Sequence, residues 1–196
     1  EKDGVEHTND ERGLKRKLAS LRSFYRYLYK NEMIGQDPAV KVDMPKIHEK
    51  TITRLDIDEV ANLLDEVESG ESLTEKQQKF HEKTKTRDLA MMTLLLGTGI
   101  RVSECVGLNI EDVDFKENRI KIIRKGGKEE YVYFGEDVAE ALGNYIELSR
   151  CEIEPKEGHE HALFYSIQRR RITVRAVEEL VKDYAAQVTS FKHITP

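Results

Sequence analysis

Long apolar runs, paired cysteines and export signals are absent from this 196-residue sequence. Its longest apolar run, residues 94–96 with their neighbours, is too short to cross a bilayer, so we expect no membrane span. The 2 cysteines, Cys105 and Cys151, are too few for a disulfide scaffold and are typical of a reducing cytosol. Residues 1–3 are polar and include neither a secretory signal nor an initiator methionine, which indicates a piece of a longer cytoplasmic protein.

Metal-ligand clusters and internal repeats are missing as well. His159 and His161 stand two residues apart with no further ligand nearby, so we predict no metal site and no cofactor. A hydrophobic share of 38% and a charged share of 35% describe a soluble chain. The length is enough for one domain with a sizeable core, or for a small unit followed by a larger one.

Charge is distributed unevenly along the chain. The net charge of -5 argues against a nucleic-acid partner when taken globally, but its distribution must decide. The acidic residues are concentrated at 56–71 and 152–160. Residues 12–30 carry no acidic side chain and contain the basic residues Arg12, Lys15, Arg16, Lys17, Arg22, Arg26 and Lys30. A second basic cluster contains Arg169, Arg170, Arg171 and Arg175. A chain segregated in this way can still present a basic face to DNA.

The first basic segment has the pattern of an amphipathic helix. Thr8 and Glu11 have capping-box spacing and predict its start. One apolar stripe, which we predict to be buried, contains Leu14, Leu18, Leu21, Tyr25 and Leu28. A neighbouring basic stripe contains Lys15, Arg22, Arg26 and Lys30. This second stripe is either a solvated polar face or a contact surface for DNA, and the pattern leaves both open.

Capping residues and apolar periodicity predict further helices. Asp56 and Glu59 cap one whose inward side contains Ile57, Val60, Leu63, Leu64 and Val67. Residues 68–80 are expected to form a polar loop before a buried helix that begins at Thr86 or Arg87. Residues 137–150 predict another helix, with inward residues Val138, Leu142, Tyr145, Ile146 and Leu148. Thr173 caps the last, with inward residues Val174, Val177, Leu180, Val181 and Tyr184.

The apolar run at residues 89–96 ends in a glycine-rich segment. Gly97 and Gly99 are expected to stop the helix, as glycine does at helix C-termini. Arg101 then opens a short second helix in which Glu104 lies one turn further on, where the two side chains can pair.

A β-hairpin follows, with a turn at Gly126 and Gly127. Apolar alternation on either side predicts a two-residue type I′ turn that pairs Ile122 with Tyr131 and Ile120 with Tyr133. The same register places Lys125 opposite Lys128, and like charges in that position are destabilising. Either both ammonium groups point apart into water, or a polyanion normally sits between them.

The arginines before the last helix raise a similar choice. Arg169, Arg170 and Arg171 come just before its start, and Arg175 lies in its first turn. Free N–H groups and the dipole favour phosphate at a helix N-terminus, so the cluster predicts an anion seat there. The alternative is an exposed loop that is rich in arginine by chance.

The segment G-T-G-I-R-V-S-E-C-V-G-L (97–108), followed by an acidic helix start, a strand, R-K-G-G-K and a second strand, resembles the catalytic domain of tyrosine recombinases. These are the phage and transposon integrases and the Xer-type resolvases, and the similarity runs from about Arg12 to Pro196. The resemblance implies that Arg101 contacts the scissile phosphate, that Lys125 protonates the leaving group and that Glu104 supports Arg101. The residues expected to contact DNA are Lys15, Arg22, Arg26, Lys30, Lys128, Arg169, Arg170, Arg171 and Arg175.

The resemblance also implies a fold. We expect a mainly helical α+β protein in which residues 1–45 are the last helices of a helical, SAM-like core-binding domain and residues 46–53 are a linker. Residues 54–196 would form the catalytic domain, with a small antiparallel hairpin or sheet.

Motifs that the family needs for catalysis are not found in this sequence. A His-x-x-Arg motif, a His or Trp and the nucleophilic Tyr would follow a segment like residues 194–196, and His193 should not be mistaken for the first of them. The tyrosines that are present, none in the family's position, are Tyr25, Tyr27, Tyr29, Tyr131, Tyr133, Tyr145, Tyr165 and Tyr184. We therefore expect a truncated catalytic domain that is inactive by itself.

The expected function is site-specific DNA cleavage and rejoining through a 3′-phosphotyrosyl intermediate, for integration or excision of a mobile element. The alternative is a DNA-binding or regulatory relative without a nucleophile, and a helical interaction protein that does not bind DNA is a more distant one. The expected partners are duplex DNA and an accessory directionality factor. The protein is expected to form a homotetramer on synapsed DNA and to be a monomer without DNA. The expected location is the cytoplasm, in association with the nucleoid.

Overall fold

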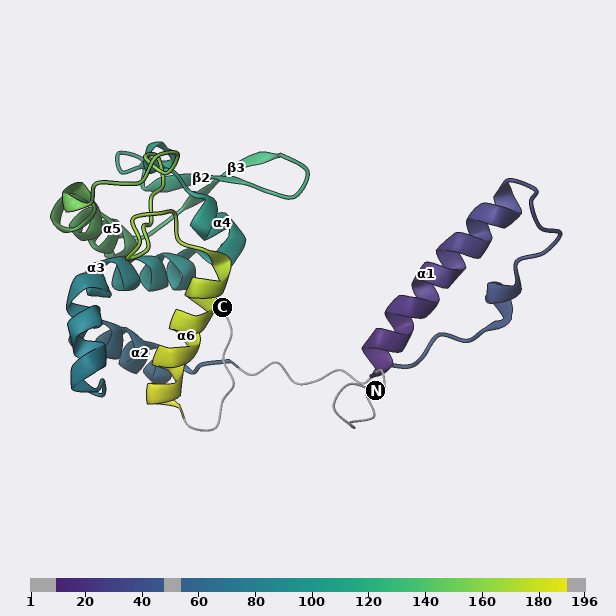
Figure 1. Ribbon diagram of the computed structural model, residues 1–196, viewed down its shortest axis with the longest axis horizontal. Coiled ribbons are helices and arrows are strands. Elements are labelled where there is room, and N and C mark those ends of the chain that lie inside the picture. Colours follow the sequence, from purple (N-terminus) through teal and green to yellow (C-terminus); the bar gives the residue numbers. More distant parts are fainter. Residues whose placement is uncertain (1–9, 48–53, 190–196) are drawn as a thin grey trace. The chain divides into compact units, whose positions relative to one another are not determined.

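A computed structural model describes residues 10–47 and 54–189. The chain divides into two compact units, Glu1–Ile52 and Thr53–Pro196. Figure 1 shows the order of the elements along the chain.

The first unit consists of one long helix and a short 3₁₀ helix. Helix α1 spans Glu11–Lys30, and its N-cap is Asp10, whose side chain accepts a hydrogen bond from the Gly13 N–H at 2.6 Å. Asp10 thus takes the capping place predicted for Thr8, which lies outside the described residues. Helix η1 spans Pro38–Lys41 and follows an N-cap at Asp37.

The predicted burial of the apolar stripe on α1 is wrong for the described residues. No side chain of α1 is buried, and Leu14 and Leu21 are 48% and 51% exposed. The reason is geometrical, because a helix of 20 residues is about 30 Å long and η1 has only 4 residues with which to cover it.

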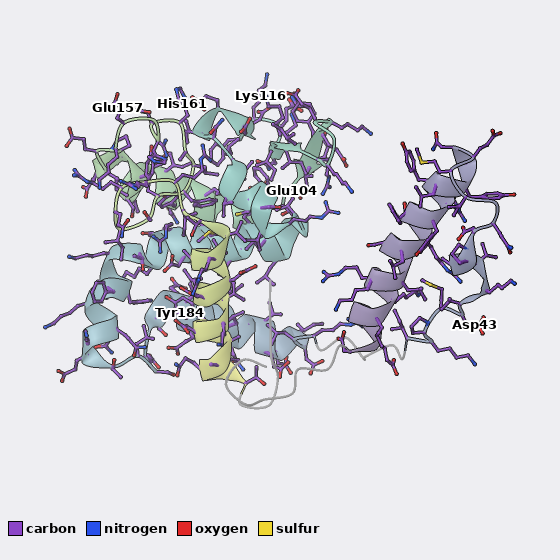
Figure 2. The ribbon with its side chains drawn as sticks, turned by 45° about the vertical axis from the view of Figure 1, so that its right-hand side comes forward. Asp43, Glu104, Lys116, Glu157, His161 and Tyr184 are labelled. Atoms are coloured by element: carbon purple, nitrogen blue, oxygen red, sulfur yellow. The ribbon has the colours of Figure 1, made fainter. Side chains whose placement is uncertain are left out.

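The second unit is built from four long helices, α2 (Ile57–Ser69), α3 (Glu75–Thr98), α5 (Glu136–Leu148) and α6 (Val174–Val188). Helix α3 packs against α2 and α5, and α6 packs against α2 and the short helix α4, Val102–Gly107 (Figure 1). Their facing side chains form one core that includes Leu63, Met91, Leu142 and Val177. Tyr184 on α6 joins it with 7% exposure (Figure 2).

Several predicted boundaries and faces need correction. Helix α3 begins at Glu75 rather than at residue 86 or 87, because Thr74 and Gln77 form a capping box inside the segment expected to be a loop. Ile57 and Leu148 were expected to face inward but are 88% and 64% exposed. Each is the first or last residue of its helix, where apolar periodicity no longer implies a neighbouring element.

The two glycines at the end of α3 have different roles. Gly99 is the C-cap with φ 63°, a left-handed conformation that glycine adopts without a steric penalty. Gly97 does not stop the helix as predicted but lies inside it, where a Cβ would come within 2.7 Å of Val138 Cγ2. Gly97 therefore lets α3 and α5 approach each other closely.

A three-stranded antiparallel sheet completes the second unit. Its order is β1 (Val113–Asp114), β2 (Arg119–Ile123) and β3 (Glu129–Tyr133). Together with the helices, it confirms the mainly helical α+β class expected from the sequence.

The predicted hairpin register is wrong by one residue. Ile120 pairs with Val132 and Ile122 with Glu130, so neither isoleucine lies opposite a tyrosine. Since side chains alternate with period two, this shift sends every residue of β3 to the other face. Ile120 and Ile122 are buried, whereas Tyr131 and Tyr133 are 53% and 64% exposed. The Arg119 guanidinium carbon lies 4.5 Å from the centroid of the Tyr131 ring.

Candidate active site

The short helix α4 (Val102–Gly107) positions the predicted phosphate-binding arginine. Arg101 is its N-cap, and its backbone N–H donates to Glu104 Oε2 at 2.8 Å. Its Nη1 donates to Glu104 Oε1 at 2.9 Å, while 69% of the Arg101 side chain stays exposed. The predicted helix start and pairing are confirmed, and most of the guanidinium faces solvent.

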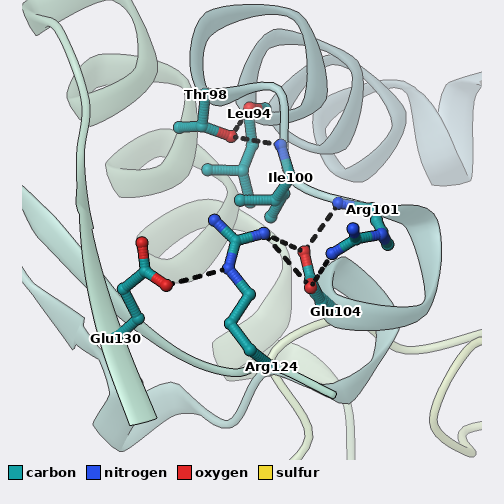
Figure 3. Close-up of polar contacts among 7 residues, drawn as sticks. All are labelled: Leu94, Thr98, Ile100, Arg101, Glu104, Arg124 and Glu130. Atoms are coloured by element: carbon teal, nitrogen blue, oxygen red, sulfur yellow. Dashed lines mark hydrogen bonds and ion pairs between the residues drawn. The ribbon is translucent and has the colours of Figure 1, made fainter. Parts of the chain in front are cut away.

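Glu104 is the centre of the site. Its side chain is only 6% exposed and accepts hydrogen bonds from two arginines, Arg101 and Arg124 (Figure 3). Burial alone raises the pKa of the Glu104 carboxyl. The hydrogen bonds from the Arg101 N–H and guanidinium, together with the nearby Arg124 charge, more than offset this and bring the pKa below 4.5. The carboxylate is therefore ionised at neutral pH and holds two guanidinium groups.

The sequence pattern does not single out Arg124 as a site residue, although it stands directly before Lys125. Its Nη1 donates to Glu104 Oε1 and Oε2 at 3.2 and 3.1 Å, and its Nε donates to Glu130 Oε2 at 3.2 Å (Figure 3). The hydrogen bond to Glu130 and the charge of Glu104 raise the pKa of Arg124 against the opposing effect of burial. The correct register would have pointed to this residue, because it makes Arg124 and Glu130 diagonal neighbours across the hairpin.

The hairpin tip carries Lys125 in a loop of residues 125–127. The Arg124 N–H donates to the Lys128 carbonyl at 2.8 Å, which closes the ladder, and the Gly127 N–H returns to the Arg124 carbonyl at 3.1 Å. Gly126 and Gly127 have φ of 88° and 79°. Lys125 is thus not opposite Lys128 as predicted, since Arg124 takes that place. Both lysines are exposed.

The second arginine cluster is divided among different contacts. Arg169, with φ 62°, lies 3.7 Å from Glu154, and Arg170 is exposed in the same loop. Arg175 is 86% exposed and pairs with Glu179 at 2.9 Å, just after the Thr173 N-cap of α6. Arg170 and Thr173 line one hollow near the start of α6, where the anion seat was predicted.

Arg171 differs from its neighbours because its guanidinium is bonded to the end of α4. Its Nη1 donates to the carbonyls of Val106 and Leu108 at 2.9 and 2.7 Å, and its Nη2 donates to Asn109 Oδ1 at 2.5 Å. An arginine in this position stabilises the free carbonyls of a helix C-terminus. Arg171 therefore holds the helix that begins at Arg101, whatever it does toward DNA.

The basic stripe predicted on α1 lies in the other unit. Lys15, Arg26 and Lys30 are exposed, whereas Arg22 is half-buried. The Arg22 Nε donates to the Ala39 carbonyl at 3.3 Å, and its Nη2 bonds the Val42 carbonyl, so this side chain fastens α1 to the end of η1.

Reactive groups in the core are held in their neutral forms. Burial raises the pKa of the Cys105 thiol to about 12, in agreement with the small buried hydrophobe expected there. Burial likewise raises the pKa of Tyr145 to about 12, and its hydroxyl accepts a hydrogen bond from the Tyr165 N–H at 3.2 Å. Burial also raises the pKa of Tyr184. None of these three side chains presents a nucleophile at the surface.

The two histidines of the acidic loop contact other residues. His161 bonds the Glu111 carboxylate, and His159 Nδ1 accepts from the Arg171 N–H at 3.3 Å. Across residues 10–47 and 54–189, no group of three or more potential ligand side chains is arranged to hold a metal ion. Within those same ranges, no helix has the length and apolarity needed to span a bilayer.

The lowered pKa of Glu104 predicts a pH-dependent contribution to stability. Glu104→Gln should reduce the free energy of unfolding by about 1.5–3 kcal/mol at pH 7, because hydrogen bonds to a charged group are lost. Since the folded pKa lies below the unfolded one, wild type keeps this advantage above pH 4.5 and loses it as the pH falls through the folded value. Urea unfolding from pH 7 to pH 3 measures the difference.

Glu179→Gln is the matched control for this measurement. It removes an exposed ion pair with Arg175, which contributes only a few tenths of a kcal/mol. An equal loss of stability in both variants, or a difference that stays constant with pH, would contradict the assigned role of Glu104.

Arg101, at the start of α4, is joined through the Glu104 carboxylate to Arg124, at the base of the hairpin tip that carries the exposed Lys125. Residues 53–196 match the Phage integrase family. The chain belongs to this family of tyrosine recombinases.

Two curated tyrosine recombinases align in sequence with most of this chain. A tyrosine recombinase XerC of Thermodesulfovibrio yellowstonii is 36% identical over 183 residues, covering 92% of this chain and 57% of the relative. A tyrosine recombinase XerC of Caldanaerobacter subterraneus subsp. tengcongensis is 35% identical over 182 residues, covering 91% of this chain and 46% of the relative. This chain therefore spans about half the length of these curated relatives.

Solved structures share the fold. The crystal structure of XerA recombinase aligns with a TM-score of 0.60 at 25% identity, covering 93% of this chain and 56% of that one. A lambda integrase (75-356) dimer bound to a COC′ core site aligns with a TM-score of 0.68 at 16% identity, covering 95% and 62%. At the latter identity the likeness establishes the fold alone.

Proposed function

We propose that this chain is the DNA-binding and phosphate-activating part of a site-specific recombinase that cleaves and rejoins duplex DNA through a 3′-phosphotyrosyl intermediate. The observation that carries the proposal is the shared carboxylate of Glu104. It joins Arg101, at the start of α4, to Arg124, at the base of the loop that contains Lys125. Family membership and the DNA-bound state of the lambda integrase relative support the choice of substrate.

In this proposal Arg101 binds the non-bridging oxygens of the scissile phosphate. A guanidinium has a planar fork that suits two oxygens and stays ionised at any physiological pH. Its exposed side chain is held by Glu104 at one nitrogen, which leaves the other donors for phosphate. Charge that grows on the phosphate oxygens in the transition state is thereby stabilised in place.

Lys125 is proposed as the general acid. When the tyrosine oxygen forms its bond to phosphorus, the bond to the 5′-oxygen breaks, and this oxygen needs a proton. The exposed ammonium at the hairpin tip would supply it, a role that accounts for about 10²- to 10⁴-fold in rate for typical general acids. The nucleophilic tyrosine and the His-x-x-Arg motif are proposed to lie outside these 196 residues, in the full-length protein.

The two units have separate roles in this proposal. Residues 1–45 are the end of a core-binding domain, in which Lys15, Arg26 and Lys30 contact backbone phosphates, and residues 54–196 are the catalytic part. Lys128, Arg169, Arg170 and Arg175 extend the contact surface. Arg22 and Arg171 hold their own units together and contact DNA only with donors left free by those bonds.

The whole recombinase is proposed to act as a homotetramer on two synapsed DNA sites and to be monomeric without DNA. An accessory directionality factor would select integration or excision of a mobile element. We propose that it acts on DNA of the nucleoid, in the cytoplasm.

Salt-dependent binding of the 196-residue chain to duplex DNA tests the proposed function. The logarithm of the binding constant should fall linearly with the logarithm of salt concentration, by about 0.9 for each phosphate contact. Lys128→Gln should weaken binding to every sequence and lower the slope by about 1. Lys182→Gln, which neutralises an exposed lysine on α6 outside the proposed surface, is the control and should change neither.

The same mixtures test the assignment of the nucleophile. No covalent protein–DNA adduct should accumulate with this chain, because none of its tyrosines is proposed to attack phosphate. Adducts would contradict that assignment, and the absence of salt-dependent binding to duplex DNA would contradict DNA as the partner. A full-length protein that binds DNA and also forms no adduct would be the regulatory relative instead.

A further inference from the structure

The loop that carries Lys125 has few contacts of its own. Gly126 and Gly127 both adopt left-handed conformations, and neither would meet another atom within 4 Å through an added Cβ. In the described part of the chain, the Lys125 side chain has no hydrogen bond or ion pair. Packing at the tip therefore does not fix where the ammonium group lies.

One step toward the body of the unit, Arg124 is held tightly. Its side chain is 29% exposed and bonds both oxygens of Glu104 on α4, while Nε bonds Glu130 on β3. Its backbone N–H closes the last step of the β2–β3 ladder at the Lys128 carbonyl. The side chain of Arg124 thus bonds both α4 and β3 (Figure 3), while its backbone bonds Lys128.

The carboxylate that Arg124 binds is the one that also orients Arg101. Both guanidinium groups reach Glu104 Oε1, at 2.9 Å from Arg101 and 3.2 Å from Arg124. A displacement of Arg124 would change the position of Lys125 relative to Arg101, because Lys125 is the next residue. Proton transfer to a leaving group is sensitive to such a displacement, and about 1 Å can cost on the order of 10²-fold in rate.

We propose that Arg124 is a positioning residue that holds the hairpin tip on Glu104, so that the Lys125 ammonium meets the same phosphate that Arg101 binds. The proposal rests on the proposed function, since it presumes that Lys125 is the acid. It assigns Arg124 no contact with DNA. Its effect passes through the location of Lys125 alone.

Backbone dynamics of the 196-residue chain provide the first test. In Arg124→Met, the ¹⁵N order parameters of Gly126 and Gly127 should fall from about 0.85 toward 0.6 or below, the range of flexible backbone. Arg119→Met is a matched control, because Arg119 lies on β2 of the same hairpin, is 30% exposed and is paired with Asp114 on β1. It should leave the tip unchanged. An unchanged tip in Arg124→Met would overturn the proposal.

Cleavage by the full-length protein provides the second test. Arg124→Met should slow cleavage of ordinary DNA by about 10- to 100-fold with little change in DNA affinity. On DNA with sulfur in place of the 5′-bridging oxygen, whose leaving group needs no proton, the variant should cleave at nearly the wild-type rate. Equal slowing on both substrates would mean that Arg124 only stabilises the fold or the phosphate site, and would overturn the proposal.

Comparing Lys125→Ala with Arg124→Met on sulfur DNA distinguishes a failure of the positioning role from a failure of the proposed function. If Lys125→Ala is not rescued by sulfur, the acid role of Lys125 fails. If Lys125→Ala is rescued and Arg124→Met is not, only the positioning role fails. Arg124→Lys provides the same comparison should the methionine variant unfold, because lysine keeps the charge but has no planar fork that reaches Glu104 and Glu130 with two nitrogens. The cleavage rate of Arg124→Lys on oxygen DNA is expected to lie between the rates of wild type and Arg124→Met.

Discussion

Replacing Arg101 with alanine in the full-length protein is expected to lower the rate of covalent adduct formation by about 10³- to 10⁵-fold, the range for an arginine that stabilises a phosphoryl transition state. DNA affinity should change little, since Arg101 is one of many proposed phosphate contacts. Adduct formation per bound complex, measured on gels under single-turnover conditions, separates the two effects.

The structure predicts that this variant folds. Glu104 would lose its partner at one oxygen, but Arg124 would still bond both oxygens at 3.2 and 3.1 Å, so no buried charge is left unpaired. Arg54→Ala, which removes an exposed arginine ahead of α2, is the matched control and should cleave at the wild-type rate.

A different outcome would assign Arg101 to DNA docking. In that case affinity would collapse and the adduct rate per bound complex would hold. Arg101→Lys refines the comparison, because a lysine keeps the charge but offers no planar fork. Arg101→Lys should bind DNA as wild type does and recover the rate of adduct formation only in part.

Lys125→Ala has the second largest expected effect, a loss of about 10²- to 10⁴-fold in cleavage of ordinary DNA. The rate should return to near wild type on DNA with a 5′-bridging sulfur, because a thiolate departs without a proton. This expectation follows from the proposal that Lys125, which is exposed at the tip, protonates the departing oxygen.

Lys128→Ala is the matched comparison for Lys125→Ala. Lys128 is also exposed, yet its backbone closes the ladder with Arg124 and its proposed role is a phosphate contact. It should weaken binding and show no preference for sulfur DNA. Sulfur rescue of Lys128→Ala with none for Lys125→Ala would transfer the acid role to Lys128.

An error of one residue in the predicted hairpin register gives Arg124 the wrong neighbours. The alternation of Ile120, Ile122, Tyr131 and Tyr133 favours the register in which all four share one face. In the observed register, shifted by one residue, the isoleucines are buried and the tyrosines are exposed. The two-residue turn favoured by sequence would have left Arg124 opposite Glu129. The loop of residues 125–127 instead aligns Arg124 with Lys128 and brings Glu130 within reach.

The first unit shows a second limit of periodicity. The stripe of Leu14, Leu18, Leu21, Tyr25 and Leu28 correctly predicts a helix, because residues of similar polarity recur at its repeat. The same pattern says only that a surface suits burial. Whether it is buried depends on which elements lie against it, and η1 is too short to cover it.

Residue type and spacing alone identify the family, most of the helical segments and the short helix capped by Arg101 with Glu104 one turn on. Those features depend on local spacing, capping residues and glycine, which act within a few residues of one another. Folding is what brings Arg124 to the Glu104 carboxylate and Arg171 to the end of α4. Both contacts join residues that are far apart in the chain, and they form only once the packing of the helices and the register of the hairpin have brought those residues together.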